Sequence, residues 1–389
     1  MEQGHSTLRR RLLGGLAAGL ASVGGSLKAQ TTQSQFGPFG EDRSGLRAQP
    51  LFEGLENPWA FCFLPDRSLL VTERPGRMRL MQFQGQSAQL SAPLQGLPEV
   101  HAMGQGGLLD VITSSDFARD QTLFFSLAQP TDRGARTAIF RAQLKGLTLS
   151  QVQLIFAQKH DPSGRHHFGC RLLIASDGML YASMGERFFQ AKQAQSLDNH
   201  FGKVIRIGLD GGVPGNNPFV GKGDALAEIY SYGHRNPQGL ASHPQTQNLW
   251  MHEHGPQGGD ELNILAAGRN YGWPSITYGR EYVTNLRIGE GTSRADVQPP
   301  VHYWIPSIAP SGLCFVRRSP IDALRGGLLI GSLKERCLAF LRLQGDRVIG
   351  EQRLLTGLNA RVRDVRESPT GELLFITDES RGALLRLSV

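Results

Sequence analysis

The sequence lacks long apolar runs, helical periodicity and closely spaced cysteines. After the first 30 residues, no stretch approaches the roughly 20 apolar residues that a membrane-spanning helix needs, so we predict that the protein is not integral to a membrane. No long segment repeats its apolar residues with the 3.6-residue period of a helix. The four cysteines are far apart and form no CxxC pair, which argues against a zinc knuckle and leaves one disulfide open.

The chain also lacks a basic stripe. Four basic residues against one acidic residue give the first 29 positions +3 of the formal net charge of +7, so the rest of the chain keeps +4. Because no basic run is interleaved with aromatic residues, we expect no nucleic-acid partner. With 40% hydrophobic and 19% charged residues, the composition is that of a globular protein with a large core.

Residues 1–30 have the pattern of an export signal. Three arginines, Arg9 to Arg11, precede a short apolar segment rich in Gly, Ala and Leu that ends in small residues. Arginines followed by two leucines suit the twin-arginine route, and the general secretory route stays open. We therefore predict a periplasmic protein, with an N-terminal extension over residues 31–50 and one domain over residues 51–389. A disordered cytoplasmic tail is the alternative interpretation of the first segment.

Turn residues are abundant, with 48 glycines and 21 prolines and no collagen-like period, which is typical of short strands joined by tight turns. A turn, a short apolar strand and a polar residue recur in that order six times. The central leucines of these repeats are Leu69, Leu123, Leu180, Leu249, Leu328 and Leu373. Sheets this small bury their faces against neighbours. We therefore predict an all-β fold, a six-bladed β-propeller of four-stranded antiparallel blades, in preference to a long β-sandwich or two barrels.

Polar residues are concentrated between Tyr230 and Glu261, on predicted turns beside short apolar strands, and include Arg235 and Asn236. Polar groups held on loops by a rigid sheet are the usual layout of a binding or catalytic site. Upstream, His167 stands in a loop before the predicted strand LLIASDG. A loop histidine accepts protons near neutral pH and is a candidate general base. A surface histidine without a role is the alternative.

Three cations near the C-terminus indicate an anionic ligand. Arg361 and Arg363 alternate on a predicted strand and therefore share a face, where two guanidinium groups can hold carboxylates. Lys334 adds a third positive charge. The alternative is a solvated strand face on which Asp364 is the partner of the arginines.

The run from residue 252 to residue 263 is open to three interpretations. Asp260, Glu261 and free main-chain carbonyls suit Ca²⁺, a hard cation. His252 and His254 could instead bind a transition metal, because residues two apart on a strand point the same way. In the third interpretation, Asp260 caps the backbone amides of a purely structural turn.

An ordered series of motifs covers nearly all of the chain after residue 54 and resembles the soluble quinoprotein sugar dehydrogenases, the glucose and aldose sugar dehydrogenase family. The series runs GLENPWAFCFLPDRSLLVTERPGR, GQGGLLD, HFGCR, GKVIRI, YGHRNPQGL, EHGPQGGDELN, NYGWP, WIPSIAPSG and RVRDV. The resemblance implies a six-bladed propeller that carries pyrroloquinoline quinone (PQQ) and Ca²⁺. It also implies oxidation of the anomeric carbon of aldose sugars to lactones, with electrons passed to an acceptor that the sequence does not identify.

The resemblance implies roles for individual residues. His167 corresponds to the base that takes the proton of the anomeric hydroxyl, and Arg235 to a catalytic side chain that stabilises negative charge on the quinone. The implied cofactor contacts are Gln105, Arg235, Asn236, Ser307, Lys334, Arg361 and Arg363. The implied metal-site residues are Gly255, Pro256 and Asp260 for the Ca²⁺ of the cofactor, and Glu261 and Tyr271 for a second, structural Ca²⁺.

The chain departs from the family pattern at two positions. His166 stands where glucose-specific members carry an aspartate, so we expect the orientation of His167 to rest on another group. Ser307 stands where some relatives have threonine. The long loops of the dimeric glucose-specific members are absent, which favours the aldose branch and leaves both monomer and dimer open. The alternative functions are a metal-dependent hydrolase, such as a lactonase, in which His252, Glu253 and His254 bind a metal that activates water, and a carbohydrate-binding propeller without cofactor.

Overall fold

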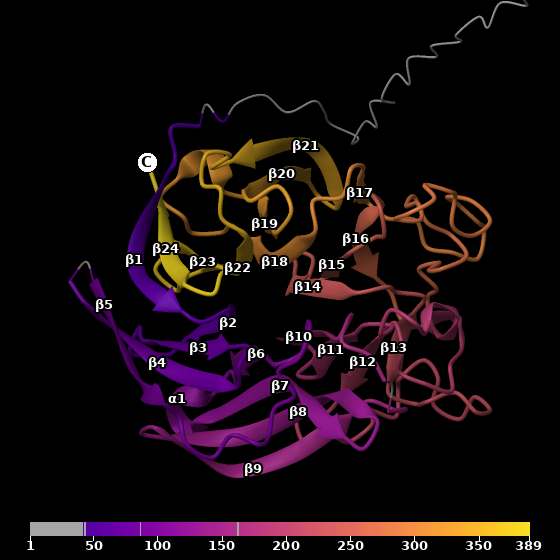
Figure 1. The fold of residues 1–389 in the computed structure, drawn as a ribbon, viewed down its shortest axis with the longest axis horizontal. Helices are drawn as coiled ribbons and strands as arrows, with labels where there is room; N and C mark the ends of the chain where they lie inside the picture. The colour runs from indigo at the N-terminus through magenta and orange to yellow at the C-terminus, as the bar shows by residue number, and fades with distance from the viewer. Residues whose placement is uncertain (1–41, 43, 86, 162) are drawn as a thin grey trace, which may run out of the picture. The chain divides into compact units, whose positions relative to one another are not determined.

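The computed structural model describes residues 42, 44–85, 87–161 and 163–389, so the predicted export signal lies outside the described residues. The described chain forms six four-stranded antiparallel sheets, arranged around an axis as a six-bladed β-propeller (Figure 1). The predicted fold class is therefore confirmed. The short helices of this part are α1 (Phe117–Asp120) and the 3-10 turns η1 (Ala191–Gln195) and η2 (Asp322–Leu324). No helix in it has the length and apolar character needed to cross a membrane.

Five blades are built from four consecutive strands. The first contains β2 (Pro58–Phe63), β3 (Leu69–Glu73), β4 (Arg77–Gln84) and β5 (Ser87–Pro93), and the second β6 (Leu108–Thr113), β7 (Thr122–Thr131), β8 (Gly134–Lys145) and β9 (Thr148–Ala157). The third contains β10 (Gly169–Ile174), β11 (Leu180–Met184), β12 (Lys203–Ile207) and β13 (Ile229–Tyr232), and the fourth β14 (Pro237–Ser242), β15 (Leu249–Glu253), β16 (Asp260–Leu265) and β17 (His302–Trp304). The fifth contains β18 (Pro310–Phe315), β19 (Leu328–Ser332), β20 (Leu338–Gln344) and β21 (Arg347–Leu354).

The sixth blade joins the two ends of the described chain. It combines β22 (Val362–Glu367), β23 (Leu373–Thr377) and β24 (Gly382–Ser388) with β1 (Arg47–Leu55). Strand β1 pairs antiparallel with β24, as the indigo and yellow strands in Figure 1 show. The propeller therefore begins at Arg47, four residues before the boundary predicted at residue 51, because the end of the predicted extension adds a strand to the last blade.

The six repeated leucines occupy equivalent positions. Each lies at or next to the first residue of the second strand of its blade, and all six are buried. One apolar cluster fills each of the six junctions between neighbouring blades. In the junction between the fourth and fifth blades, Trp250 and Trp304 are fully buried. Each buried large apolar side chain contributes about 1.5–3 kcal/mol, so stability is spread around the whole ring.

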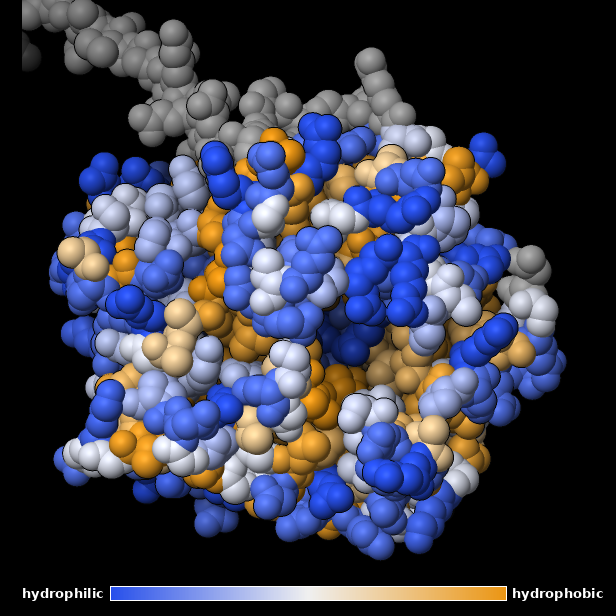
Figure 2. All heavy atoms as spheres, turned by 180° about the vertical axis from the view of Figure 1, so that it is seen from behind, coloured by the Kyte–Doolittle hydropathy of each residue, from blue (hydrophilic) through white to orange (hydrophobic). Residues whose placement is uncertain are grey.

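The first strand of each blade lies innermost, since these six strands contact one another around the axis. In every blade the pairing of this strand with the second strand shifts register within its first residues. Such bulges redirect side chains and interrupt pairing. The irregular backbone therefore gathers at the end of the axis where the inner strands begin. Figure 2 shows one face of the molecule, with a hollow near its middle that is lined by hydrophilic residues.

Candidate active site

The residues predicted to form the site gather at the end of the axis where the inner strands begin. The second strand of each antiparallel blade ends there too, so loops before a first strand meet loops after a second strand. Residues in or beside the loops before first strands are Gln105, His167, Arg235, Asn236, Ser307, Arg361 and Arg363. Residues after second strands, or at the start of the third strand β16, are Lys334, Gly255, Pro256, Asp260 and Glu261.

His167 is fixed by contacts from two loops. Its Nδ1 lies 3.0 Å from Oε1 of Glu186, in the loop after β11. Its main-chain N–H donates to Oε1 of Gln105 at 2.8 Å. The backbone of His167 has a φ of 50°, and its side chain is 7% exposed. When the carboxylate accepts the Nδ1–H, Nε2 is the ring nitrogen that remains to accept a proton.

The surroundings keep the imidazole neutral. Burial lowers the pKa of His167 well below its ordinary value of 6.5, and the positive charges of Arg235 and Arg187 act in the same direction. Burial also raises the pKa of Glu186 to about 7. A neutral imidazole can accept a proton, and an ionised Glu186 can hold the required tautomer. The pair is therefore suited to act as a base above the pKa of Glu186.

Arg235 and Asn236 approach the same place from the fourth blade. Nη1 of Arg235 donates to the carbonyl oxygens of Gly255 at 2.7 Å and His254 at 3.1 Å. Oδ1 of Asn236 accepts the N–H of Gly169 at 3.2 Å. Among the described residues, Nε of Arg235 and Nδ2 of Asn236 are buried without an acceptor. Each side chain is thus held by a main-chain contact and has a buried nitrogen without an acceptor.

Arg361 and Arg363 share a face, as predicted, and converge on one carboxylate. Nη2 of Arg363 lies 2.6 Å and Nη2 of Arg361 lies 3.2 Å from Oδ2 of Asp378. The alternative with Asp364 as their partner is wrong, because Asp364 pairs instead with Arg366 at 2.9 Å. The Nε of Arg363 is a further buried donor without an acceptor in the described chain. Lys334, the third predicted cation, is exposed.

Asp260 connects the two loops on either side of it. Its Oδ1 accepts the N–H of Gly255 at 2.8 Å, and its Oδ2 accepts the hydroxyl of Ser307 at 2.6 Å and the N–H groups of Ile308 and Ala309, both at 2.8 Å. Burial raises the pKa of this carboxyl to about 6. The contacts are those of an acid that caps backbone amides and supports the Gly255 turn.

Glu261 and Tyr271 line one cavity of about 90 Å³. Burial raises the pKa of Glu261 well above its ordinary value, and Glu253, its cross-strand neighbour, adds to the effect. The hydroxyl of Tyr271 donates to the carbonyl of Ile264 at 2.8 Å and accepts the N–H of Ala266 at 2.9 Å. The structure thus brings the two predicted residues together but engages the tyrosine hydroxyl with the backbone.

His252 and His254 do not form a metal site with each other. Nε2 of His252 lies 3.4 Å from the carbonyl of Gly312, and Nε2 of His254 lies 2.5 Å from the carbonyl of Pro310. Burial lowers the pKa of His252 to about 3. Within the described ranges, no group of three or more His, Cys, Asp or Glu side chains is placed to hold a metal ion.

The sequence of the chain matches a known protein family. The sequence model of the family described as glucose/sorbosone dehydrogenase matches residues 55–386. The chain belongs to this family. The chain is 41% identical over 350 residues to the aldose sugar dehydrogenase YliI of Escherichia coli K12, covering 88% of this chain and 93% of that protein. Membership of the glucose/sorbosone dehydrogenase family agrees with the resemblance in the motifs.

Solved structures of glucose/sorbosone dehydrogenase relatives share the fold. The soluble aldose sugar dehydrogenase of Escherichia coli in its apo-form matches with a TM-score of 0.85 and 40% identity, covering 88% of this chain and 99% of that one. The PQQ-bound aldose sugar dehydrogenase of Streptomyces coelicolor matches with a TM-score of 0.71 and 26% identity, covering 88% and 98%.

One carboxylate of the site, Glu186, was missed in the sequence, and a second, Glu253, was considered there only as part of a possible metal site with His252 and His254. Glucose-specific relatives carry an aspartate where this chain has His166, and the orientation of His167 was therefore expected to depend on another group. Glu186 is that group. Glu253 accepts the main-chain N–H of Arg235 at 2.5 Å and lies 2.9 Å from Nδ1 of His234. Both carboxylates lie at or just after the end of a second strand, where polar residues followed every predicted strand. That position was the available signal, but it did not indicate which polar residue faces the axis.

A cavity of about 680 Å³ opens beside the base. Its lining includes Glu186, Phe188, Lys192, Arg235, Pro256 and Trp273. Glu186, the partner of the candidate base, thus faces the same cavity as the candidate catalytic arginine and one of the predicted metal-site residues. The cavity is large enough for a small organic ligand.

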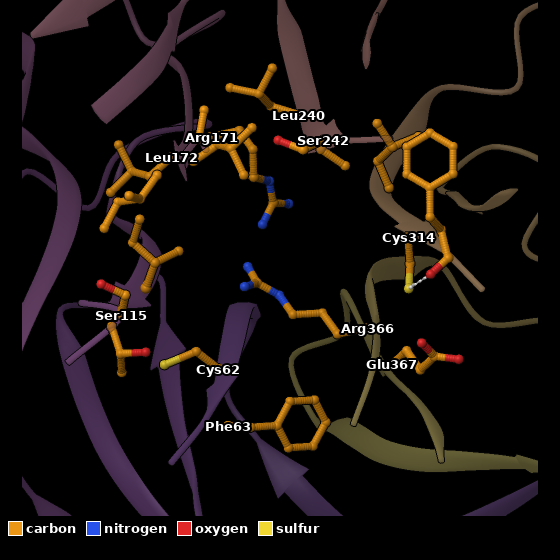
Figure 3. A pocket seen from close by; sticks show the side chains of 18 of the residues that line it. Cys62, Phe63, Ser115, Arg171, Leu172, Leu240, Ser242, Cys314, Arg366 and Glu367 are labelled. Atoms are coloured by element: carbon orange, nitrogen blue, oxygen red, sulfur yellow. Dashed lines mark hydrogen bonds between the residues drawn. The ribbon is translucent and has the colours of Figure 1, made fainter. Parts of the chain in front are cut away.

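A second cavity, of about 840 Å³, lies at the opposite end of the axis, where the inner strands end. Figure 3 shows Arg171 and Arg366 directed into it. Oδ1 of Asp110 lies 3.1 Å from Nη1 of Arg171 and 2.8 Å from Nη2 of Arg366. Asp364 also pairs with both arginines, so two negative charges balance two positive ones. Burial raises the pKa of Cys62, which also lines this cavity, to about 12. A balanced ion cluster and a protonated thiol give this larger cavity no evident reactive group.

Proposed function

We propose that the protein is a quinoprotein dehydrogenase that oxidises the anomeric carbon of aldose sugars to lactones, with PQQ as hydride acceptor and Ca²⁺ to polarise it. Family membership supports a sugar substrate, and PQQ is named in the description of the Streptomyces relative. The observation that carries the proposal is a neutral His167 imidazole held by the Glu186 carboxylate, beside buried donors that have no acceptor.

The donor set fits an anionic, acceptor-rich cofactor. Nε of Arg235, Nδ2 of Asn236 and Nε of Arg363 are among the buried donors that find no acceptor in the described chain. Buried donors of this kind cost free energy unless a ligand satisfies them. Asp378 balances only one of the charges of Arg361 and Arg363. The remaining positive charge favours a quinone that carries carboxylates.

His167, Glu186 and Arg235 would have separate roles in sugar oxidation. A quinone bound here would accept the hydride from the anomeric carbon. His167 would accept the hydroxyl proton at Nε2, and Glu186 would stabilise the imidazolium that forms. Arg235, next to the base, would stabilise negative charge on the acceptor.

Main-chain carbonyls would hold the metal. Gly255 and Pro256 lie on the turn supported by Asp260, and carbonyl oxygens suit Ca²⁺. In this structure the carbonyl of Gly255 accepts a hydrogen bond from Arg235, so the metal and the arginine would share this acceptor. Glu261 and Tyr271 are the residues proposed for a second Ca²⁺.

Reconstitution of the purified protein tests the proposal. With PQQ and CaCl₂ added, we expect aldose-dependent reduction of an electron-accepting dye and retention of quinone absorbance after gel filtration. His167→Gln should retain the quinone but lose about 100-fold or more in kcat, because the base is gone. A protein that neither retains quinone nor oxidises any aldose would refute the proposal. Hydrolysis of lactones without quinone would support the hydrolase instead.

We propose in addition that residues 1–30 direct export to the periplasm, on the pattern of arginines and the apolar segment. Expression with and without these residues, followed by cell fractionation, tests this. The full sequence should give periplasmic protein and the shortened one cytoplasmic protein; equal distribution would count against an export signal.

A further inference from the structure

The turn that follows Glu186 has an unusual backbone. Arg187 has a φ of 65° and Phe188 a φ of 67°, two consecutive non-glycine residues in the left-handed region. Side chains rarely adopt this conformation, and it persists only where the surrounding structure imposes it. The turn lies directly beside the candidate base, so its cause bears on the chemistry.

The side chain of Arg187 holds the turn in place through hydrogen bonds to the main chain. Its side chain is fully buried and donates to three main-chain carbonyls, those of His166 at 3.0 Å, Ala135 at 2.9 Å and Gly164 at 2.8 Å. Its guanidinium carbon lies 3.6 Å from the ring centre of Phe168. The loop that carries the base and the turn after Glu186 are therefore held together as one rigid unit.

Phe188 is displayed by this rigid unit at the mouth of the cavity. Its ring lies 5.3 Å from the ring of His167, at 70° to it, and the residue is 42% exposed. It lines the 680 Å³ cavity together with Glu186, Arg235 and Trp273. An aromatic ring that is nearly half exposed gains little from core packing. The strained backbone thus places the apolar face of the Phe188 ring beside the candidate base and leaves that ring partly exposed.

We propose that Phe188 is a specificity-determining residue that contacts the sugar. The C–H face of a pyranose ring packs against the phenyl ring, and the anomeric hydroxyl is thereby directed to Nε2 of His167. The inference rests on the proposed function. Sugar C–H groups carry partial positive charge and the face of an aromatic ring is negative, so this contact is favourable as well as apolar.

The neighbouring Phe189 provides a matched control. It has the same side chain and is more exposed, at 73%, but it does not line the cavity. The reconstituted holoenzyme is assayed with D-glucose and D-xylose as wild type, Phe188→Ala, Phe188→Tyr and Phe189→Ala. We expect Phe188→Ala to raise KM about tenfold, the range for loss of one apolar contact, with kcat within twofold. Phe188→Tyr should restore KM, and Phe189→Ala should match wild type.

The outcomes separate this inference from the proposed function. If wild type oxidises no aldose, the proposed function fails. If wild type is active and Phe188→Ala keeps its KM, or changes it no more than Phe189→Ala does, the inference is overturned. A fall in kcat without a change in KM also overturns it, because Phe188 would then act on the base rather than on the sugar. Thermal unfolding of each variant checks that the fold is retained.

Discussion

Replacement of Glu186 by glutamine tests the central feature of the site. In the wild type, Nδ1 of His167 lies 3.0 Å from Oε1 of Glu186. When this carboxylate is ionised it accepts the Nδ1–H, and Nε2 keeps its lone pair. A glutamine amide can donate to Nδ1 instead, which favours the tautomer with its proton on Nε2. We therefore expect Glu186→Gln to lose the base without losing the imidazole.

The expected loss of kcat is about 100-fold. The contact is 3.0 Å long and joins side chains that are 7% and 1% exposed, so water screens it little. A hydrogen bond to a charged group contributes roughly 1.5–3 kcal/mol, and each 1.36 kcal/mol is tenfold in rate. The upper part of that range applies because the site is buried. KM should change less than kcat, since Glu186 acts through His167.

The pH profile gives an independent measurement. Below the pKa of Glu186, about 7, the carboxyl is protonated and loses the negative charge that stabilises an imidazolium at His167. The kcat/KM of wild type should therefore rise with pH through this pKa, and the rise should be absent in Glu186→Gln. The charges of Arg235, Arg187 and Glu253 also act on the pKa of Glu186, and the positive charges of the two arginines oppose the effect of burial. The assay is steady-state dye reduction between pH 5.5 and 9.

Glu228→Gln is the matched control. Glu228 also faces a histidine, with its Oε2 at 3.9 Å from Nε2 of His200, but it lies away from the cavity beside the base. This variant should keep the kcat and the pH profile of wild type. If Glu186→Gln retains both as well, the reasoning about the His167 tautomer is refuted.

Three further predictions concern the cofactor, the fold and the cysteines. Arg361→Ala should weaken PQQ binding about tenfold in a calorimetric titration, because Asp378 then balances the whole charge of Arg363 and the site loses one positive charge; an unchanged Kd would remove Arg361 from the cofactor site. Lys203→Met should lower the free energy of unfolding in urea by about 3 kcal/mol, since the buried Nζ donates to the carbonyls of Gln193, Ala194 and Phe201; equal stability would contradict this. The thiols of Cys62 and Cys314 should resist a thiol reagent at pH 8 until the protein unfolds, because burial raises the pKa of each to about 12; rapid labelling of the native protein would be the contrary result.

Local pattern was sufficient for the fold class. Turn residues and short apolar strands are properties of neighbouring residues, and the six leucines marked the second strand of every blade. The propeller begins four residues before the predicted boundary at residue 51, because its first strand pairs with a strand far away in the sequence. Arg47 belongs to the sheet through its pairing with Ser388, at the other end of the chain. No local pattern reports a partner so distant in sequence.

The same division applies to the site. Motifs determined which residue types stand on which loops, and the loops predicted from the sequence do meet at one end of the axis. Tertiary structure alone decided the partners. Asp378 rather than Asp364 faces the arginine pair, and Glu186 rather than a neighbour of His167 holds the imidazole. Closure of the ring brings loops from different blades into contact, and burial between them shifts the pKa values of His167 and Glu186. The left-handed turn at Arg187 and Phe188 also depends on these contacts. No single stretch of sequence encodes either feature.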